Sequence, residues 1–239
     1  MEKLRRSHGR RGILLAALIL AASGQVEAAQ HASGGDSPKL VTLIVLDGFR
    51  ADRLTKFEDL FGEGGFKLLM EKGASFTSAH YGHLTTYTAV GHATIPSGSY
   101  AYRNGMVGND WYDRGRKVRV YCCEDAEAQY LGEPTKKHAG TSPKNLLGTT
   151  VGDELLMSNN FQSKVIAISL KDRGAILPGG KLGKAYWWSS ATGRFITTTY
   201  YMKDYPDWVK QFNEGRPADK YFGQEWTRLL PESAYARST

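Results

Sequence analysis

The stretch from Thr85 to Tyr100, TTYTAVGHATIPSGSY, concentrates hydroxyl side chains around a single histidine. A Thr or Ser hydroxyl attacks a substrate at neutral pH only when a base or a metal ion helps to remove its proton. The same residue types also cap helices, so a structural role is the alternative. The stretch alone leaves six candidate nucleophiles open, which are Thr85, Thr86, Thr88, Thr94, Ser97 and Ser99.

Two apolar runs elsewhere in the chain end in charged residues. Residues 40–46 precede Asp47, and residues 164–170 precede Lys171 and Arg173. Such runs predict fully buried parallel strands, and sites in α/β sheets form beyond the carboxyl ends of such strands. One anion and two cations at these ends suit a metal ion together with a phosphate group. As plain alternatives, the carboxylate would belong to a turn and the cations to a local surface ion pair.

A predicted short helix and an asparagine complete the groups needed for phosphoryl transfer. The helix would run from Thr88 to Ile95, until Pro96 and Gly98 stop it, and its N-terminus would direct free N–H groups at an anion. Asn109 would donate to a phosphoryl oxygen, although an asparagine before an aspartate also suits a turn.

The rest of the chain alternates between helix and strand patterns. Helices are predicted at 66–72 with Gly73 as terminator, from Ser142-Pro143 onward, and at 150–159. A short strand is predicted at 74–80, and a hairpin within 185–201 turning at 191–193. This alternation predicts an α/β fold.

The N-terminus predicts export. Five basic residues precede an apolar run at 13–22 and a small-residue exit, as in a secretory signal peptide. Ten apolar residues are too few to span a bilayer. We therefore expect a signal peptide at 1–28, a linker at 29–38, a domain from 39 to 239, and a periplasmic or secreted protein not held in the membrane after cleavage.

Net charge argues against nucleic-acid binding. Residues 1–28 carry five basic and two acidic side chains, so the formal charge of +7 falls to +4 in the mature chain. No run of Lys and Arg with interleaved aromatic residues occurs there.

The neighbouring Cys122 and Cys123 are expected to be buried or paired with cysteines elsewhere, because a bridge between neighbours is strained.

Several segments in the right order resemble the alkaline phosphatase superfamily, and within it the periplasmic zinc-dependent alkaline phosphatases with a threonine nucleophile. They are VTLIVLDGFRAD, TAVGHATIPSG at 88–98, GNDW at 108–111, SPKNLL at 142–147, SLKDRG at 169–174 and the stretch 197–213. The resemblance implies an α/β/α sandwich with a central, mostly parallel sheet, which would be incomplete in this chain.

The same resemblance implies a role for each candidate residue. Asp47 would be a metal ligand, and Thr88 would be both a ligand of the activating zinc and the nucleophile that forms a phosphothreonine intermediate. Asn109, Lys171 and Arg173 would hold the transferred phosphoryl group. Two zinc ions, a small-molecule phosphate monoester and a monomer are implied. His83 and His92 would have packing or hydrogen-bonding roles.

Three alternatives stay open. Related phosphodiesterases share the Asp, Thr and Asn but not the Lys-x-Arg pair, which favours a monoesterase. A truncated, non-catalytic phosphate-binding remnant is the second alternative. A sulfatase is disfavoured, because sulfatases use a modified Cys or Ser and the two cysteines lie outside the Thr88 segment.

The chain departs from that family in its metal ligands. The family takes most zinc ligands from its second half, yet no histidine here follows His138, and the Asp residues after Arg173 have no neighbouring His. We expect this chain to be the N-terminal portion of a longer enzyme, and to be inactive or nearly so alone.

This shortage of ligands makes a testable prediction about zinc. The purified 239-residue chain is expected to bind less than one tightly held zinc ion, because two oxygen ligands do not complete a tetrahedral site. Equilibrium dialysis with metal analysis measures the stoichiometry. Tight binding of two zinc ions would contradict the expectation.

Overall fold

The structure is a computed structural model that describes residues 38–136 and 139–236. The predicted signal peptide, and all of the predicted linker except Pro38, lie outside the described residues. The chain divides into two compact units, Met1–Ile44 and Val45–Thr239, and the second contains every described helix and strand. No helix among the described residues is long and apolar enough to cross a membrane.

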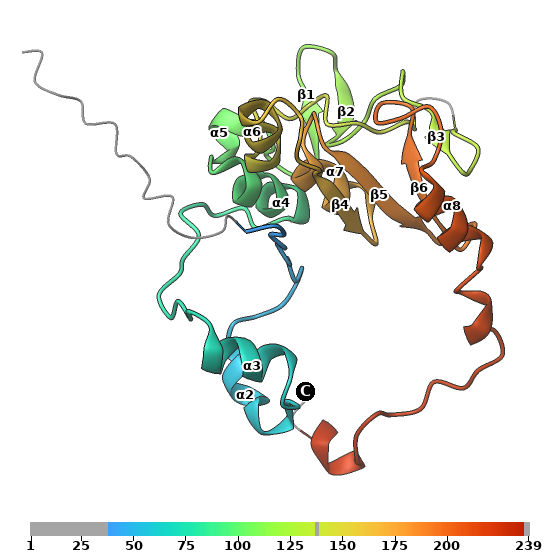
Figure 1. The fold of residues 1–239 in the computed structure, drawn as a ribbon. Helices are drawn as coiled ribbons and strands as arrows, with labels where there is room; N and C mark the ends of the chain where they lie inside the picture. Colours follow the sequence, from blue (N-terminus) through green and yellow to red (C-terminus); the bar gives the residue numbers. More distant parts are fainter. Residues whose placement is uncertain (1–37, 137–138, 237–239) are drawn as a thin grey trace, which may run out of the picture. The chain divides into compact units, whose positions relative to one another are not determined.

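Short helices and short strands make up the regular structure of the second unit (Figure 1). The helices are α2 (Asp52–Lys56), α3 (Gly65–Lys72), α4 (Thr88–Ser97), α5 (Ala101–Asn104), α6 (Val151–Ser158), α7 (Asp172–Gly179) and α8 (Asp207–Glu214). The strands are β1 (Asp110–Asp113), β2 (Val118–Tyr121), β3 (Tyr130–Leu131), β4 (Ile166–Ser169), β5 (Lys184–Ser189) and β6 (Arg194–Thr198). Short 3₁₀ helices are η1 (Glu58–Leu60), η2 (Asp219–Tyr221) and η3 (Glu232–Tyr235).

The larger sheet is mixed, with the strand order β3-β6-β5-β4. Strands β4 and β5 are parallel, whereas β5 pairs antiparallel with β6 and β6 with β3. Strands β1 and β2 form a separate antiparallel pair. A parallel pair requires a crossover, and α7 supplies it. The predicted α/β class is confirmed. The sheet of the described strands is mixed rather than mostly parallel as expected, because β6 pairs antiparallel with both β5 and β3.

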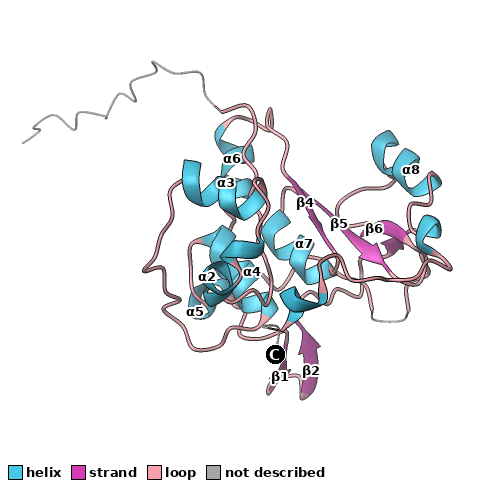
Figure 2. Cartoon of the chain, turned by 90° about the horizontal axis from the view of Figure 1, so that it is seen from below, coloured by secondary structure: helices cyan, strands magenta, loops and turns pink. Residues whose placement is uncertain are grey.

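Helices pack on both faces of this sheet. Helix α7 packs against β4 and β5, and α4 lies beside α7 (Figure 2). Gly179 of α7 approaches Ala185 of β5 so closely that an added Cβ would lie 3.3 Å from the Ala185 Cβ. Because side chains alternate along a strand, the next residue, Tyr186, points to the other face. There its ring meets Trp208 of α8, with centroids 5.1 Å apart. The layers follow the predicted α/β/α order.

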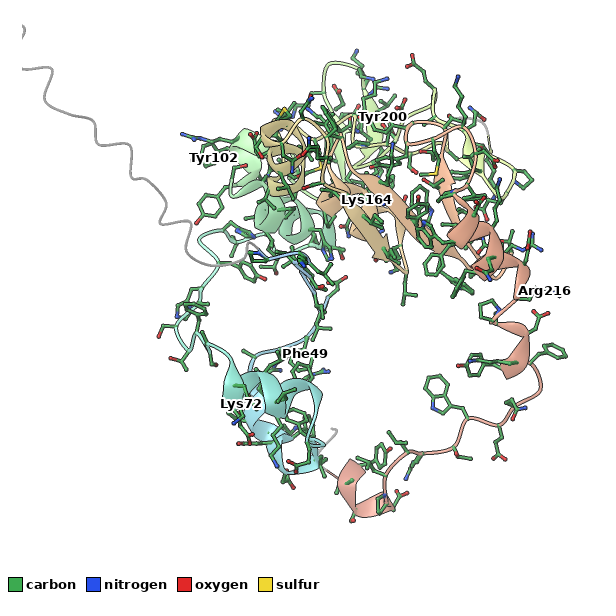
Figure 3. All side chains as sticks on the ribbon, viewed as in Figure 1. Phe49, Lys72, Tyr102, Lys164, Tyr200 and Arg216 are labelled. Atoms are coloured by element: carbon green, nitrogen blue, oxygen red, sulfur yellow. The ribbon has the colours of Figure 1, made fainter. Side chains whose placement is uncertain are left out.

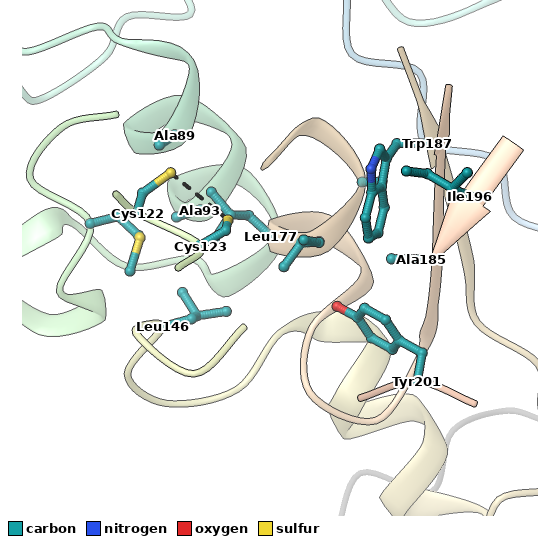
Figure 4. Packing of buried hydrophobic residues seen from close by; sticks show 13 residues of the cluster. Ala89, Ala93, Cys122, Cys123, Leu146, Leu177, Ala185, Trp187, Ile196 and Tyr201 are labelled. Atoms are coloured by element: carbon teal, nitrogen blue, oxygen red, sulfur yellow. Dashed lines mark hydrogen bonds between the residues drawn. The ribbon is translucent and has the colours of Figure 1, made fainter. Parts of the chain in front are cut away.

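The hydrophobic core joins α4, α7 and the sheet (Figure 4). Its buried residues are Ala89, Ala93, Met106, Cys122, Cys123, Leu146, Ala175, Ile176, Leu177, Ala185, Trp187, Ile196 and Tyr201. Alanines on α4 and α7 allow these helices to approach closely. Tyr200, labelled in Figure 3, packs edge-on against Tyr201 with centroids 5.0 Å apart.

Helix α6 begins with a capping box whose carboxylate also holds a loop. Thr150 Oγ1 accepts from the Asp153 N–H, and Asp153 Oδ2 accepts from the Thr150 N–H at 2.9 Å. The buried Asp153 carboxylate also accepts from the N–H groups of Lys181 and Leu182, at 3.2 and 2.7 Å. Three N–H···O bonds to the carboxylate make burial of this charge tolerable. The loop after α7 is thereby fixed to the start of α6.

The predicted buried strand at residues 40–46 does not form. The segment has no regular backbone pairing, and Leu40, Val41 and Ile44 are 82%, 82% and 72% exposed. An extended segment becomes a strand only when a neighbour satisfies its N–H and C=O groups. No described strand pairs with it, so this prediction is wrong for this chain.

The second predicted buried strand forms, but it is not fully buried. Strand β4 is terminal in the sheet order, with β5 as its one partner among the described strands. Ile166 and Ile168 are therefore 49% and 56% exposed. The prediction of the strand is confirmed, and the prediction of its complete burial is wrong.

Two further local predictions are wrong, and four are confirmed. Residues 74–80 form no strand, because no described strand pairs with them. Ser142-Pro143 begins a turn instead of a helix, and the Leu146 N–H donates to the Pro143 carbonyl at 2.9 Å. The structure confirms the helices predicted at 66–72, 88–95 and 150–159 and the hairpin turning at 191–193. Pro96 does not stop the helix from Thr88, which continues to Ser97 and ends at Gly98.

Replacing Gly180 with alanine is expected to destabilise the fold. Gly180 has a φ of +66°, and an added Cβ would lie 2.5 Å from both Asp153 Oδ2 and Thr150 Oγ1. Backbone strain and overpacking together should cost about 3 kcal/mol in the free energy of unfolding, measured by urea denaturation. Gly148→Ala, at a φ of +74° with no atom within 4 Å, is the matched control and should cost about 1–2 kcal/mol. Equal losses would contradict the role of this contact.

Candidate active site

Thr88 is the first residue of α4, and its hydroxyl does not cap the helix. Tyr87 occupies the N-cap position in an extended conformation and makes no side-chain cap. Thr88 Oγ1 instead donates to Asp47 Oδ2 at 3.0 Å, across 41 residues of sequence. The structure therefore brings together the predicted nucleophile and the predicted metal-binding carboxylate, and the capping alternative for Thr88 is not what the structure shows.

Asn109 is held beside Thr88 by the backbone of α4. Asn109 Oδ1 accepts from the Ala89 N–H at 2.9 Å, and the Asn109 carbonyl accepts from the Cys122 N–H at 2.9 Å. Since the side-chain oxygen is used in this way, the Nδ2 amide group has no acceptor among the described residues and is left to donate to a ligand. Asn109 is thus more than a turn residue.

Lys171 and Arg173 lie at the start of α7, Lys171 as its N-cap and Arg173 in its first turn. Among the described residues neither side chain forms a salt bridge, so the local ion pair with Asp172 is absent. Asp172 Oδ1 instead accepts from the Tyr121 hydroxyl at 2.7 Å and from the Arg173 N–H at 2.8 Å. Arg173 Nη1 donates to the Tyr121 hydroxyl at 3.4 Å.

The electrostatics of this cluster keep the guanidinium charged. Burial opposes the charge of Arg173, but the hydrogen bond to Tyr121 and the nearby Asp172 carboxylate raise its pKa above the ordinary value. Burial, followed by the same carboxylate, raises the pKa of Tyr121 far above its usual range. The tyrosine hydroxyl therefore stays protonated at every relevant pH.

His92 connects the two helices that carry the site. Its Nδ1 lies 2.9 Å from the Thr88 carbonyl, and the side chain is 8% exposed. An added Cβ on Gly174 of α7 would lie 3.9 Å from His92 Nε2. These contacts agree with the predicted packing role. No hydrogen bond joins Lys171 or Arg173 to the Thr88 group among the described residues.

A cavity of about 330 Å³ borders the Asp47–Thr88 pair. Tyr81, His83 and Tyr87 are among its lining residues. The His83 ring lies against Tyr81 with centroids 5.2 Å apart, and its two ring nitrogens have no hydrogen-bond partner among the described residues. This tilted ring contact agrees with the packing role predicted for His83.

Zinc suits the donors present, although they do not complete a site. Carboxylate and hydroxyl oxygens from Asp47 and Thr88 are suitable ligands, but zinc sites use three or four protein ligands. Across residues 38–136 and 139–236, no three His, Cys, Asp or Glu side chains gather to hold a metal. These two residues would hold one side of the ion.

Sequence reasoning missed Tyr121. It ends β2, 52 residues before Arg173 in the chain, and a tyrosine at a strand end carries no signal of its own. The adjacent cysteines, by contrast, are buried and free as one of the alternatives predicted. Their sulfur atoms lie 3.8 Å apart (Figure 4).

Comparison with known families agrees with this arrangement. The profile of a family described as type I phosphodiesterase / nucleotide pyrophosphatase matches residues 41–235, a range that includes all five predicted site residues. The chain belongs to this family. The match spans both helix starts that carry the candidate site.

Several relatives of the chain are named alkaline phosphatases, which confirms the resemblance. The chain is 46% identical to alkaline phosphatase PhoV of Synechococcus elongatus over 84% of its length, and 40% identical to PafA of Elizabethkingia meningoseptica over 92%. A crystal structure of a PafA variant with four substitutions superposes with a TM-score of 0.77 at 39% identity, covering 80% of this chain and 37% of that one. The chain spans 37% of PhoV and 40% of PafA.

Two substitutions of Asn109 should separate its structural role from any role toward a ligand. Asn109→Ala removes the acceptor of the Ala89 N–H and is expected to lower the free energy of unfolding by about 1 kcal/mol. Asn109→Asp keeps an acceptor at the N-terminus of α4, where negative charge is favourable, and should lower it by less than about 0.5 kcal/mol. Urea denaturation measures both losses in the free energy of unfolding. A larger loss for Asn109→Asp than for Asn109→Ala would contradict the role of Asn109 as acceptor of the Ala89 N–H.

Proposed function

We propose that the complete protein is an exported zinc-dependent hydrolase of small phosphate monoesters, with Thr88 as nucleophile. The contact between Thr88 and Asp47 at the start of α4 carries the proposal. It places a hydroxyl oxygen, a carboxylate and a helix N-terminus together, which suits attack on a phosphate.

The PafA variant supports the choice of residues. Its four substitutions replace a threonine, an asparagine, a lysine and an arginine, which lie 21, 62 and 2 positions apart. Thr88, Asn109, Lys171 and Arg173 follow one another at the same intervals. The two proteins share all four residue types and all three spacings, and chance does not explain such agreement.

Thr88 and Asp47 act at the attacking side of the phosphorus. Zinc bound by these two residues would act as a Lewis acid and make the Thr88 hydroxyl easier to deprotonate. Asp47 keeps the hydroxyl oriented through the 3.0 Å contact. The Thr88 hydroxyl loses its proton to solvent and its oxygen forms a bond to phosphorus as the bond to the leaving oxygen breaks, and that oxygen takes up a proton and departs as the alcohol. Water then attacks the phosphorus of the phosphothreonine, which releases inorganic phosphate and restores the Thr88 hydroxyl.

Asn109, Lys171 and Arg173 act on the non-bridging oxygens. The Asn109 amide group is directed by its oxygen's bond to the Ala89 N–H, and the two cations lie at the start of α7. Preorganised donors of this kind stabilise charge that develops in the transition state. Two cations favour a monoester dianion over a diester, which carries one negative charge.

A phosphodiesterase is the second candidate, because the family is described by that activity. The two functions differ in what the cationic pair contributes, so the experiment compares a nitrophenyl phosphate monoester with its bis-nitrophenyl diester. The protein expressed from its complete gene is the material for this test.

Removing Lys171 should lower turnover of the monoester selectively. Lys171→Ala is expected to reduce kcat/KM for the monoester by about 10²–10³-fold, as loss of one preorganised donor does, and to reduce the diester rate less. Lys164→Ala, which removes an exposed lysine just before β4, is the matched control and should leave both rates unchanged. A diester rate that exceeds the monoester rate in the unsubstituted protein would favour the second candidate. Unchanged monoester turnover in Lys171→Ala would refute the role of Lys171.

A further inference from the structure

The Tyr121 hydroxyl occupies the position between Asp172 and Arg173. It donates to Asp172 Oδ1 at 2.7 Å and accepts from Arg173 Nη1 at 3.4 Å. All three side chains are half-buried, and the Tyr121 ring packs against the hydrophobic core. One hydroxyl therefore links a carboxylate and a guanidinium that are adjacent in sequence but form no salt bridge with each other within the described part of the chain.

The protonation states allow both bonds to persist. The Tyr121 hydroxyl stays protonated because burial and Asp172 raise its pKa, so it always has one proton to donate. Its lone pairs then accept from the guanidinium, which has no acceptor capacity of its own. The direction of both bonds is therefore fixed.

The backbone of Tyr121 is itself anchored. Its N–H donates to Glu124 Oε2 at 3.0 Å, and its carbonyl accepts from Asn145 Nδ2 at 3.3 Å. The next residue, Cys122, donates its N–H to the Asn109 carbonyl at 2.9 Å. The end of β2 thus holds both Asn109, which precedes β1, and Arg173 of α7, two of the three groups proposed to bind phosphoryl oxygens.

We propose that Tyr121 is a positioning residue, which holds the Arg173 guanidinium in the orientation that binds a phosphoryl group. The inference rests on the proposed function. An arginine side chain is flexible, and a fixed Nη1 reduces the freedom it must lose on binding. Arg173 Nε is buried without a partner, so the Tyr121 contact is the hydrogen bond that orients the guanidinium within the described structure.

A double-mutant cycle in the complete gene product tests this inference. Tyr121→Phe is expected to lower kcat/KM for a nitrophenyl phosphate monoester by about 5–20-fold, as the loss of one hydrogen bond between a neutral hydroxyl and a charged group does. It should also weaken binding of inorganic phosphate. In an Arg173→Ala background the same substitution should have less than about a twofold effect, because the group it positions is gone. In a Lys171→Ala background the full effect should remain.

Tyr130→Phe is the matched control. Tyr130 also packs against the core, but its hydroxyl donates to the Ala139 carbonyl. A similar loss in Tyr130→Phe, or an undiminished effect of Tyr121→Phe in the Arg173→Ala background, would overturn the positioning role while leaving the proposed function intact. Absence of both turnover and phosphate binding in the unsubstituted protein would instead refute the proposed function, and the inference with it.

Discussion

Close packing of α4 against α7 is the constraint on which the candidate site depends. Ala89 and Ala93 on α4 and Ala175 on α7 are fully buried in the shared core. Small side chains let two helices approach closely, and loss of packing at such a contact is costly. Each helix carries part of the proposed chemistry in its first turn, so this packing fixes the proposed nucleophile relative to the cations proposed to bind phosphate.

Helix α7 is in turn fixed to the sheet by another close approach. An added Cβ at Gly179 would lie 3.3 Å from the Cβ atoms of both Ala167 and Ala185, on the two parallel strands. The Asp153 carboxylate then holds the loop that leaves α7. The cationic start of the helix is therefore positioned from its opposite end, by residues that have no part in the proposed chemistry.

The small β1–β2 hairpin supports two residues of the candidate site. Its two ends place Asn109 just before β1 and Tyr121 at the end of β2, and the Cys122 N–H joins them. The groups proposed to bind non-bridging oxygens are therefore supported by one strand end as well as by two helices. A second layer of support of this kind is what a preorganised site requires.

Local signals in the sequence determined much of this protein. The capping residues of α6, the stop after α4 and the turn between β5 and β6 depend on neighbours in sequence, and each was predictable from residue type alone. The five candidate residues were also identified from the sequence, because residue types in a fixed order resemble a family whose members share them.

Tertiary structure decided everything that depends on a partner distant in sequence. Residues 40–46 have the composition of a buried strand, yet they remain exposed because a strand needs a neighbour to satisfy its backbone. The contacts of Thr88 with Asp47 and of Tyr121 with Arg173 join residues 41 and 52 positions apart. Residue type sets which groups are capable of bonding, whereas the packing of helices on the sheet decides which of them come within reach.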